Sequence, residues 1–180
     1  MRSASIVSFL GWAALAGCSA PDPDLASAKR ARAMSLSDGW VRLAAGRYAW
    51  GSHLGDSCRR EEGDNQTSRL GPVLDVMLRE VTQSEFETRM GYNPSFNADC
   101  PSCPVDSVTF DEAALYCSRL GVDAEDSPCY RCEPAGGQDG VRCDPVGEFE
   151  TCSAPRLPFA HEFERAARAG TPRGTYAGPI

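Results

Sequence analysis

The segment PRLPFAHEFERAARAG, from Pro155 to Gly170, is an extended lead-in followed by a helix that ends on a glycine. Apolar residues recur in it at helical spacing, which predicts a helix over residues 159–169 with one face toward the core. That face comprises Leu157, Phe159, Phe163, Ala166 and Ala167, and the charged residues Glu162, Glu164, Arg165 and Arg168 are expected to point away from it. Gly170 is the expected C′ residue of the helix.

A second helix is predicted upstream, over residues 82–90. Thr82 is followed three residues later by Glu85, a capping box in which each side chain satisfies the other's free backbone N–H. Gly91 is expected to stop the helix. Because the cap already explains Glu85, we assign it no catalytic role.

A box of the same kind, Thr109 with Glu112, predicts the next helix. This helix is expected to run through Leu120 and to end with Gly121 as its C′ residue. Its inner face is expected to contain Phe110, Ala113, Ala114 and Cys117. Glu112, like its counterpart in the first box, is interpreted as a structural residue.

Alternating apolar residues predict short strands before these helices. Two strands, at 40–45 and 48–50, are expected to be joined by a glycine turn at Gly46, and a third strand lies at 73–78. Residues 52–71 are polar and rich in glycine, and are predicted to form a loop. Short strands combined with short capped helices indicate an irregular α+β fold.

Four segments in order carry a family resemblance: GWVRLAAGRYAWGS (39–52), VMLREVTQSEF (76–86), CPVDSVTFDEAALYCSRL (103–120) and the segment 155–170. Each resembles a signature block of the formylglycine-generating enzyme, or sulfatase-modifying factor, family. The resemblance covers residues 39 to about 176. It implies, for residues 39–180, the irregular fold of that family, which is similar to C-type lectin-like folds.

The resemblance extends only to the N-terminal portion of the family's domain. Complete members oxidise a sulfatase cysteine to formylglycine, and they use copper at a cysteine pair in a C-terminal half that also binds calcium. No segment here matches that half, so the domain is expected to be incomplete at its C-terminus. We therefore assign no catalytic residue and expect neither copper nor calcium. Cys117 matches a helix cysteine that relatives can bridge to the missing half.

The segment 155–170 departs from the family pattern at two positions. Phe159 stands where the family has a threonine N-cap, a change expected to cost about 1 kcal/mol. Arg165 stands in place of an aromatic packing group. Both changes indicate relaxed selection or a different neighbour. His161 is interpreted as an exposed replacement, and His53 as a surface residue, so neither is assigned as a metal ligand.

The N-terminus predicts a processing signal. Arg2 is followed by an apolar run, residues 6–15, that is too short to span a bilayer, for which a helix needs roughly 20 residues. Leu15-Ala16-Gly17-Cys18 resembles a bacterial lipobox, in which Cys18 becomes the lipidated first residue. Ordinary secretory cleavage, with Cys18 left as a thiol, is the alternative. Ser19 favours the outer membrane, with the protein facing the periplasm or the exterior.

The expected organisation is a signal peptide at 1–17, a lipid-anchored flexible linker at 18–38, and the partial domain at 39–180. The chain carries a net charge of −7 at pH 7, and the leader contributes only the positive charge of Arg2. This acidity argues against nucleic acid as a partner. The expected partners are the membrane, through the anchor, and a protein at the cell envelope.

Eight cysteines besides Cys18 predict disulfides, because an exported chain meets oxidising conditions. They are Cys58, Cys100, Cys103, Cys117, Cys129, Cys132, Cys143 and Cys152. The two C-x-x-C pairs, at 100/103 and 129/132, also have zinc-ribbon spacing. Zinc requires thiolates, so we expect disulfides and no zinc.

Residues 122–153 form a cysteine-rich insertion, with glycine, proline and four of these cysteines. A disulfide-stapled hairpin is expected around Gly136-Gly137. Its simplest connectivity joins Cys132 to Cys143 and Cys129 to Cys152.

The residues therefore favour an exported lipoprotein with a sulfatase-modifying-factor-like domain that is non-catalytic as it stands. Two alternatives remain. In the first, the chain is a truncated form of an enzyme that oxidises a protein cysteine to formylglycine. In the second, it is a lectin-like binding module at the cell envelope.

Overall fold

The computed structural model describes residues 4–6, 34–35, 39–51, 67–122, 126–135, 140–149 and 152–168. This part of the chain contains three helices and eight short strands, which confirms the α+β class. The helices are α1 (Gln83–Met90), α2 (Phe110–Val122) and α3 (Ala160–Arg168). The strands are β1 (Ala4–Ile6), β2 (Met34–Ser35), β3 (Trp40–Leu43), β4 (Gly46–Trp50), β5 (Thr67–Gly71), β6 (Leu74–Met77), β7 (Tyr130–Pro134) and β8 (Val141–Pro145).

The strands belong to three sheets. One sheet has the order β1-β6-β3-β2, and the other two are the pairs β4-β5 and β7-β8. The two strands predicted at 40–45 and 48–50 both exist, but they lie in different sheets and do not pair with each other. Strand β4 instead pairs with β5, with Gly46 opposite Gly71. The prediction of a loop over 52–71 is therefore wrong at 67–71, where a polar segment becomes a strand through this pairing.

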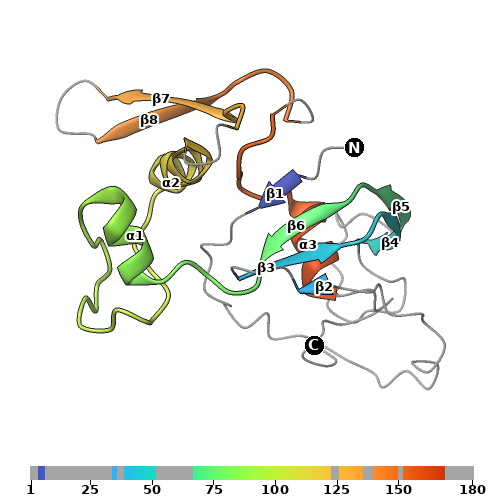
Figure 1. Cartoon of the computed structure of the whole chain (residues 1–180), viewed down its shortest axis with the longest axis horizontal. Coiled ribbons are helices and arrows are strands. Elements are labelled where there is room, and N and C mark those ends of the chain that lie inside the picture. The colour runs from blue at the N-terminus through green and yellow to red at the C-terminus, as the bar shows by residue number, and fades with distance from the viewer. Residues whose placement is uncertain are drawn as a thin grey trace.

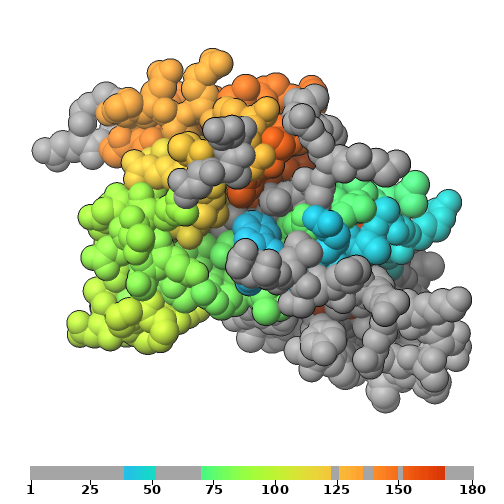
Figure 2. Space-filling model, viewed as in Figure 1, coloured from blue at the N-terminus to red at the C-terminus, as the bar shows by residue number. Residues whose placement is uncertain are grey.

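The elements form two regions (Figure 1). The helix–hairpin region comprises α1, α2, β7 and β8. In it the hairpin contacts α2, and α2 contacts α1. The sheet region comprises β1 to β6 and α3, and in it α3 contacts β4. On the face shown in Figure 2, the side chains of α1, α2 and the hairpin form one continuous body.

The capping box of α1 is confirmed. The backbone N–H of Glu85 donates to the Thr82 hydroxyl oxygen (3.3 Å), and the N–H of Thr82 donates to the Glu85 carboxylate (2.9 Å). Arg79 adds two hydrogen bonds to the same carboxylate, and mainly through them the pKa of Glu85 falls to about 2. Gly91 ends the helix at φ 86°, a left-handed conformation that suits glycine.

The capping box of α2 is also present. The Thr109 N–H donates to Glu112 (2.7 Å), and the Glu112 N–H donates to the Thr109 hydroxyl (3.2 Å). The predicted end of this helix is wrong, since α2 continues through Gly121 to Val122. Gly121 serves close packing instead. A Cβ atom at this position would lie 2.7 Å from the Cβ of Ala154.

The main core lies in the helix–hairpin region. It is built from Val81, Phe86, Val105, Ala114, Tyr116, Cys117, Cys129, Tyr130, Cys143 and Ala154. Phe86 stacks on Tyr116, with ring centroids 5.7 Å apart. The prediction that Phe110 faces the core is wrong, because its side chain is 61% exposed. Phe110 is the first residue of α2, and its ring forms a T-shaped pair with Tyr130, at 6.3 Å between centroids. Tyr116 is the buried aromatic residue of this helix.

Helix α3 buries two charged residues that were predicted to face solvent. Glu162 and Arg165, expected to point outward, are 7% and 8% exposed, whereas Phe163 is 38% exposed. Ala166, by contrast, packs as expected, against the small second cluster of Leu43 and Leu74. The physical reason is that both buried charged groups find partners, as described below.

Two short strands fall in segments predicted to be leader and linker. Residues 4–6 form β1 beside β6, and residues 34–35 form β2 beside β3. The expected flexible linker thus contains a paired segment at its end. Other predicted features lie outside the described residues: Cys18, His53, Cys58 and the Gly136-Gly137 turn.

Candidate functional site

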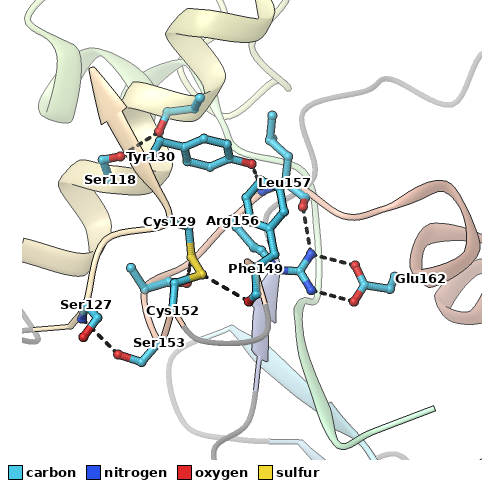
Figure 3. The surroundings of a disulfide bond; sticks show 12 residues. Ser118, Ser127, Cys129, Tyr130, Phe149, Cys152, Ser153, Arg156, Leu157 and Glu162 are labelled. Atoms are coloured by element: carbon cyan, nitrogen blue, oxygen red, sulfur yellow. Dashed lines mark hydrogen bonds and ion pairs between the residues drawn. A yellow bond between two sulfur atoms is a disulfide. The ribbon is translucent and has the colours of Figure 1, made fainter. Parts of the chain in front are cut away.

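The hairpin is stapled by two disulfides. Cys132 and Cys143 face each other across β7 and β8 and are bonded, with Cα atoms 4.1 Å apart. Cys129 is bonded to Cys152, which ties the start of the hairpin to the segment leading into α3 (Figure 3). These are the two pairs that the sequence favours as simplest. The Cys143 N–H also donates to the Asp111 carboxylate (2.9 Å), which holds the hairpin on α2.

A zinc ribbon is not assembled. Cys100 and Cys103 are bonded to each other in the loop between α1 and α2, and Cys129 and Cys132 are each bonded elsewhere. Within the described ranges, no group of three or more His, Cys, Asp or Glu side chains is arranged to hold a metal ion.

Cys117 is the free thiol of the described chain. Cys117 is a disulfide candidate in the sequence, matched to a helix cysteine that relatives can bridge to the missing half, and within the described residues it is not bonded to another cysteine. The thiol lies fully buried in the main core, and burial raises its pKa. Cys117 therefore stays protonated at neutral pH and packs as a small apolar side chain.

Arg156 and Glu162 form a buried ion pair between the lead-in segment and α3 (Figure 3). Two parallel hydrogen bonds, of 2.7 and 2.6 Å, join the guanidinium to the carboxylate. Burial raises the pKa of Glu162, but the hydrogen bonds from Arg156 and from the Phe159 N–H outweigh it and the pKa is lowered overall. Glu162 is therefore held as a carboxylate beside the guanidinium. Residue spacing alone did not reveal this pairing.

Glu162 also supplies one half of a capping box at the start of α3. Its Oε2 atom accepts the Phe159 N–H at 2.9 Å, which is the contribution of the third helical residue to a capping box. This bond satisfies the N–H of the N-cap residue itself, whereas a threonine hydroxyl at position 159 would accept the N–H of Glu162, which instead donates to the Phe159 carbonyl at 3.0 Å.

Two aromatic rings lie beside the Arg156 guanidinium. Its carbon lies 4.7 Å from the ring centroid of Phe159 and 5.7 Å from that of Phe149. Phe149 in turn packs against Tyr130, whose hydroxyl accepts the Leu157 N–H at 3.2 Å. The positive charge is therefore held between a carboxylate and ring faces.

Arg165 anchors the other side of α3. Its guanidinium donates to the backbone oxygens of Pro72 (2.7 Å) and Ala44 (2.6 Å), and lies over the Tyr48 ring. Gly71 leaves room for this side chain, since a Cβ there would collide with the Arg165 guanidinium. Of the two interpretations of Arg165, relaxed selection or a different neighbour, these contacts favour the second, because Arg165 joins α3 to Tyr48 of β4 and to the backbone at Ala44 and Pro72.

Two further charged residues complete the contact of α3 with β4. Glu164 accepts hydrogen bonds from the Gly51 N–H (3.0 Å) and from Arg168 (2.7 Å). Arg168 also donates to the Gly51 backbone oxygen (3.1 Å). Helix α3 is thus docked mainly by polar groups.

His161 is not an exposed replacement, as the sequence indicated. It is partly buried, with its ring stacked on Phe159 (5.6 Å) and edge-on to Trp50 (5.9 Å). These contacts give the imidazole a packing role between α3 and β4.

The described cysteines do not fit the copper centre that the resemblance implies for complete family members. Such a centre needs thiolate ligands. Six of the seven described cysteines are in disulfides, and Cys117 is a buried, protonated thiol. The cluster around Arg156 is a structural junction, and no group in it has the setting of a nucleophile.

The fold can be compared with known proteins. No curated protein sequence matches the chain. Among solved structures, Treponema denticola variable protein 1 is similar, with a TM-score of 0.53 and 20% identity, over 80% of this chain and 58% of that protein. The chain thus spans 58% of the length of this neighbour, and the likeness concerns the fold.

The family comparison covers most of the chain. The family model described as the sulfatase-modifying factor enzyme 1-like domain matches residues 26–179. This range includes the two capping boxes, the disulfide-stapled hairpin and the segment that ends in α3. The chain therefore belongs to the FGE-sulfatase family of sulfatase-modifying factor enzyme 1-like domains.

Proposed function

We propose that this protein is an exported lipoprotein whose FGE-sulfatase domain has no catalytic activity in the chain as given. The observation that carries the proposal is the state of the described cysteines. Disulfides occupy six of them, and the seventh, Cys117, is buried with a raised pKa. Oxidation of a protein cysteine by bound copper needs accessible thiolates.

Two observations support export. The leader and the Leu15-Ala16-Gly17-Cys18 motif are typical of bacterial lipoproteins. The disulfides of the hairpin and of the 100–103 loop suit an oxidising compartment. Within the described residues, no helix combines the length and the apolar character needed to cross a bilayer. Attachment to the membrane is proposed to be through lipid on Cys18.

The anchor is tested by fractionating cells that express the Cys18→Ala variant. We expect this variant to leave the membrane fraction and to lose incorporation of labelled fatty acid. Ser19→Ala, which keeps the cysteine at the cleavage point, is the matched control and should stay membrane-bound. An unchanged membrane fraction for Cys18→Ala would refute lipid anchoring.

Catalysis is tested with a peptide that contains the sulfatase-type sequence Cys-x-Pro-x-Arg. The protein is incubated with the peptide and copper, and the products are analysed by mass spectrometry. We expect the thiol to persist. Conversion to the aldehyde that heat denaturation abolishes would refute the proposal and favour the enzyme alternative.

A binding role is the second candidate, and the loop between α1 and α2 favours it. Phe96 is 92% exposed in this loop, yet its backbone is held on both sides. Its N–H donates to Asp106 (3.0 Å), and the next carbonyl, of Asn97, accepts from the buried Gln83 side chain (3.0 Å). An exposed aromatic side chain on a backbone that is held in place is typical of a binding residue.

This candidate is tested on a glycan array, since the lectin-like alternative specifies carbohydrate. Binding that Phe96→Ala weakens at least tenfold would support a lectin-like module. Binding that is unaffected by this substitution would exclude Phe96 as a binding residue.

A further inference from the structure

We propose that the Cys100–Cys103 disulfide is a redox site that exchanges reversibly with dithiols, whereas the two hairpin disulfides are structural. The bond lies in the loop between α1 and α2 and joins residues three apart in the sequence, against separations of 23 and 11 in the hairpin disulfides. A shorter loop constrains the unfolded chain less. This bond is therefore expected to stabilise the fold least of the three described disulfides.

The pair is more open to an external thiol than the hairpin disulfides are. Cys100 and Cys103 are both partly exposed, and residues 101–102 between them are exposed. Each hairpin disulfide instead has one buried member, since Cys129 is 1% and Cys143 is 6% exposed, and both belong to the main core. Exchange begins when a thiolate attacks one sulfur atom of a disulfide, so access decides which bond reacts. An external thiolate therefore reacts first with the 100–103 pair.

Backbone hydrogen bonds hold the turn that carries the pair. The Cys103 N–H donates to the Cys100 carbonyl oxygen at 2.9 Å. At the start of α1, the N–H groups of Gln83 and Ser84 donate to the carbonyl oxygens of Cys103 (2.9 Å) and Pro101 (3.0 Å). None of these bonds involves sulfur. They therefore remain when the disulfide opens, and they keep the two thiols close together.

The exchange has two steps. A thiolate of the reductant attacks one sulfur atom of the pair, the S–S bond breaks, and the released cysteine thiolate takes a proton. The second thiolate of the reductant then attacks the reductant's own sulfur in the mixed disulfide, and the other cysteine leaves and is protonated. Two electrons and two protons thus pass to the pair, and the reductant becomes a disulfide. No carbon atom is oxidised, so the reaction is distinct from formylglycine formation.

The held turn favours a dithiol over a monothiol as the reductant. After the first step, the released cysteine lies beside the mixed disulfide, where it attacks back and expels the reductant. A monothiol is returned unchanged, because completion requires a second molecule to arrive before this reversal. A dithiol carries its second thiol with it and completes the reaction.

The experiment treats the purified, folded whole chain with dithiothreitol, a dithiol, or with reduced glutathione, a monothiol. New thiols are alkylated at intervals, and each cysteine pair is quantified by mass spectrometry. We expect dithiothreitol to reduce the 100–103 pair at least tenfold faster than either hairpin disulfide. With glutathione alone, we expect no stable mixed disulfide on either cysteine. Comparable rates for the three pairs, or accumulation of the glutathione adduct, would overturn the inference.

Hydrogen exchange shows whether the turn survives reduction. The amides of Gln83 and Ser84 should exchange within twofold of their original rates once the 100–103 pair is reduced, because their acceptors are backbone oxygens. Loss of their protection would overturn the inference, since the disulfide would then be a structural staple.

Paired substitutions compare the two kinds of disulfide. Cys100→Ala combined with Cys103→Ala should lower the melting temperature by less than half as much as Cys132→Ala combined with Cys143→Ala, the matched control. An equal or larger fall for the 100–103 pair would contradict the redox assignment.

Discussion

The two regions of this domain are stabilised by different interactions. The helix–hairpin region has an apolar core, with Phe86 on Tyr116, and disulfides that staple its hairpin. Among the described residues, the sheet region has a small apolar cluster of its own around Leu43 and Leu74, and α3 docks onto it through Arg165, Glu164 and Arg168. The hydrophobic effect does not depend on the relative orientation of apolar groups, whereas guanidinium groups need hydrogen-bond acceptors at specific positions. The packing of the helix–hairpin region can thus be predicted from the pattern of apolar residues. The packing of the sheet region depends on which acceptors lie near each charged side chain.

The largest expected effect is in the apolar core. Phe86→Ala should lower the free energy of unfolding by about 3–5 kcal/mol, because it leaves a cavity beside Tyr116. Phe96→Ala is the matched control, since its ring is 92% exposed and its loss should change stability by less than about 0.5 kcal/mol. Urea denaturation followed by circular dichroism measures both. Equal losses would mean that the helix–hairpin region lacks a packed core.

The buried ion pair of Arg156 and Glu162 should contribute nearly as much to the free energy of unfolding. Arg156→Met leaves the Glu162 carboxylate buried without its partner and should cost about 3 kcal/mol. Adding Glu162→Gln removes the stranded charge but keeps an oxygen for the Phe159 N–H, so the double variant should recover more than half of the loss. A double variant as unstable as the sum of the single variants would show that the pair is not coupled.

Close packing around α2 should give an intermediate effect. Gly121→Ala puts a Cβ atom 2.7 Å from that of Ala154, and should destabilise the protein by about 1–3 kcal/mol even though alanine favours helix. At Gly46 a Cβ meets nothing within 4 Å, so Gly46→Ala should be close to neutral. Thermal unfolding compares the two. A neutral Gly121→Ala would restore the interpretation of Gly121 as an ordinary helix end.

The smallest effect is expected at the exposed cap of α1. The pKa of Glu85 is lowered from 4.5 to about 2, so its contribution to stability is present above pH 4.5 and is lost as the pH falls toward 2. Because this carboxylate is more than one-third exposed, we expect a contribution of under about 1 kcal/mol. The stability of Glu85→Gln should therefore fall less steeply than wild type over this range, as measured by urea denaturation at several pH values. Identical slopes would contradict the prediction.

Several features followed from the sequence because short-range interactions determine them. Each capping box joins residues three apart, so Thr82 and Glu85 meet whenever the helix forms. The two hairpin disulfides follow from nested spacing within one insertion. Membership in the family likewise rested on local signature blocks, and the family model confirms it.

Other features were decided only by tertiary contacts. The orientation of α3 depends on Arg165 reaching Pro72 and Ala44, which are 93 and 121 residues away in the sequence. Periodicity predicted that Arg165 faces solvent. It treats every charged residue as solvent-facing and does not take into account that backbone oxygens can satisfy a buried guanidinium. The role of Gly121 likewise depends on Ala154, which lies in another segment. The sequence by itself determined which segments become helices and which cysteines of the insertion pair most simply. The tertiary structure decided which faces of the helices are buried, because burial depends on residues that are distant in the chain.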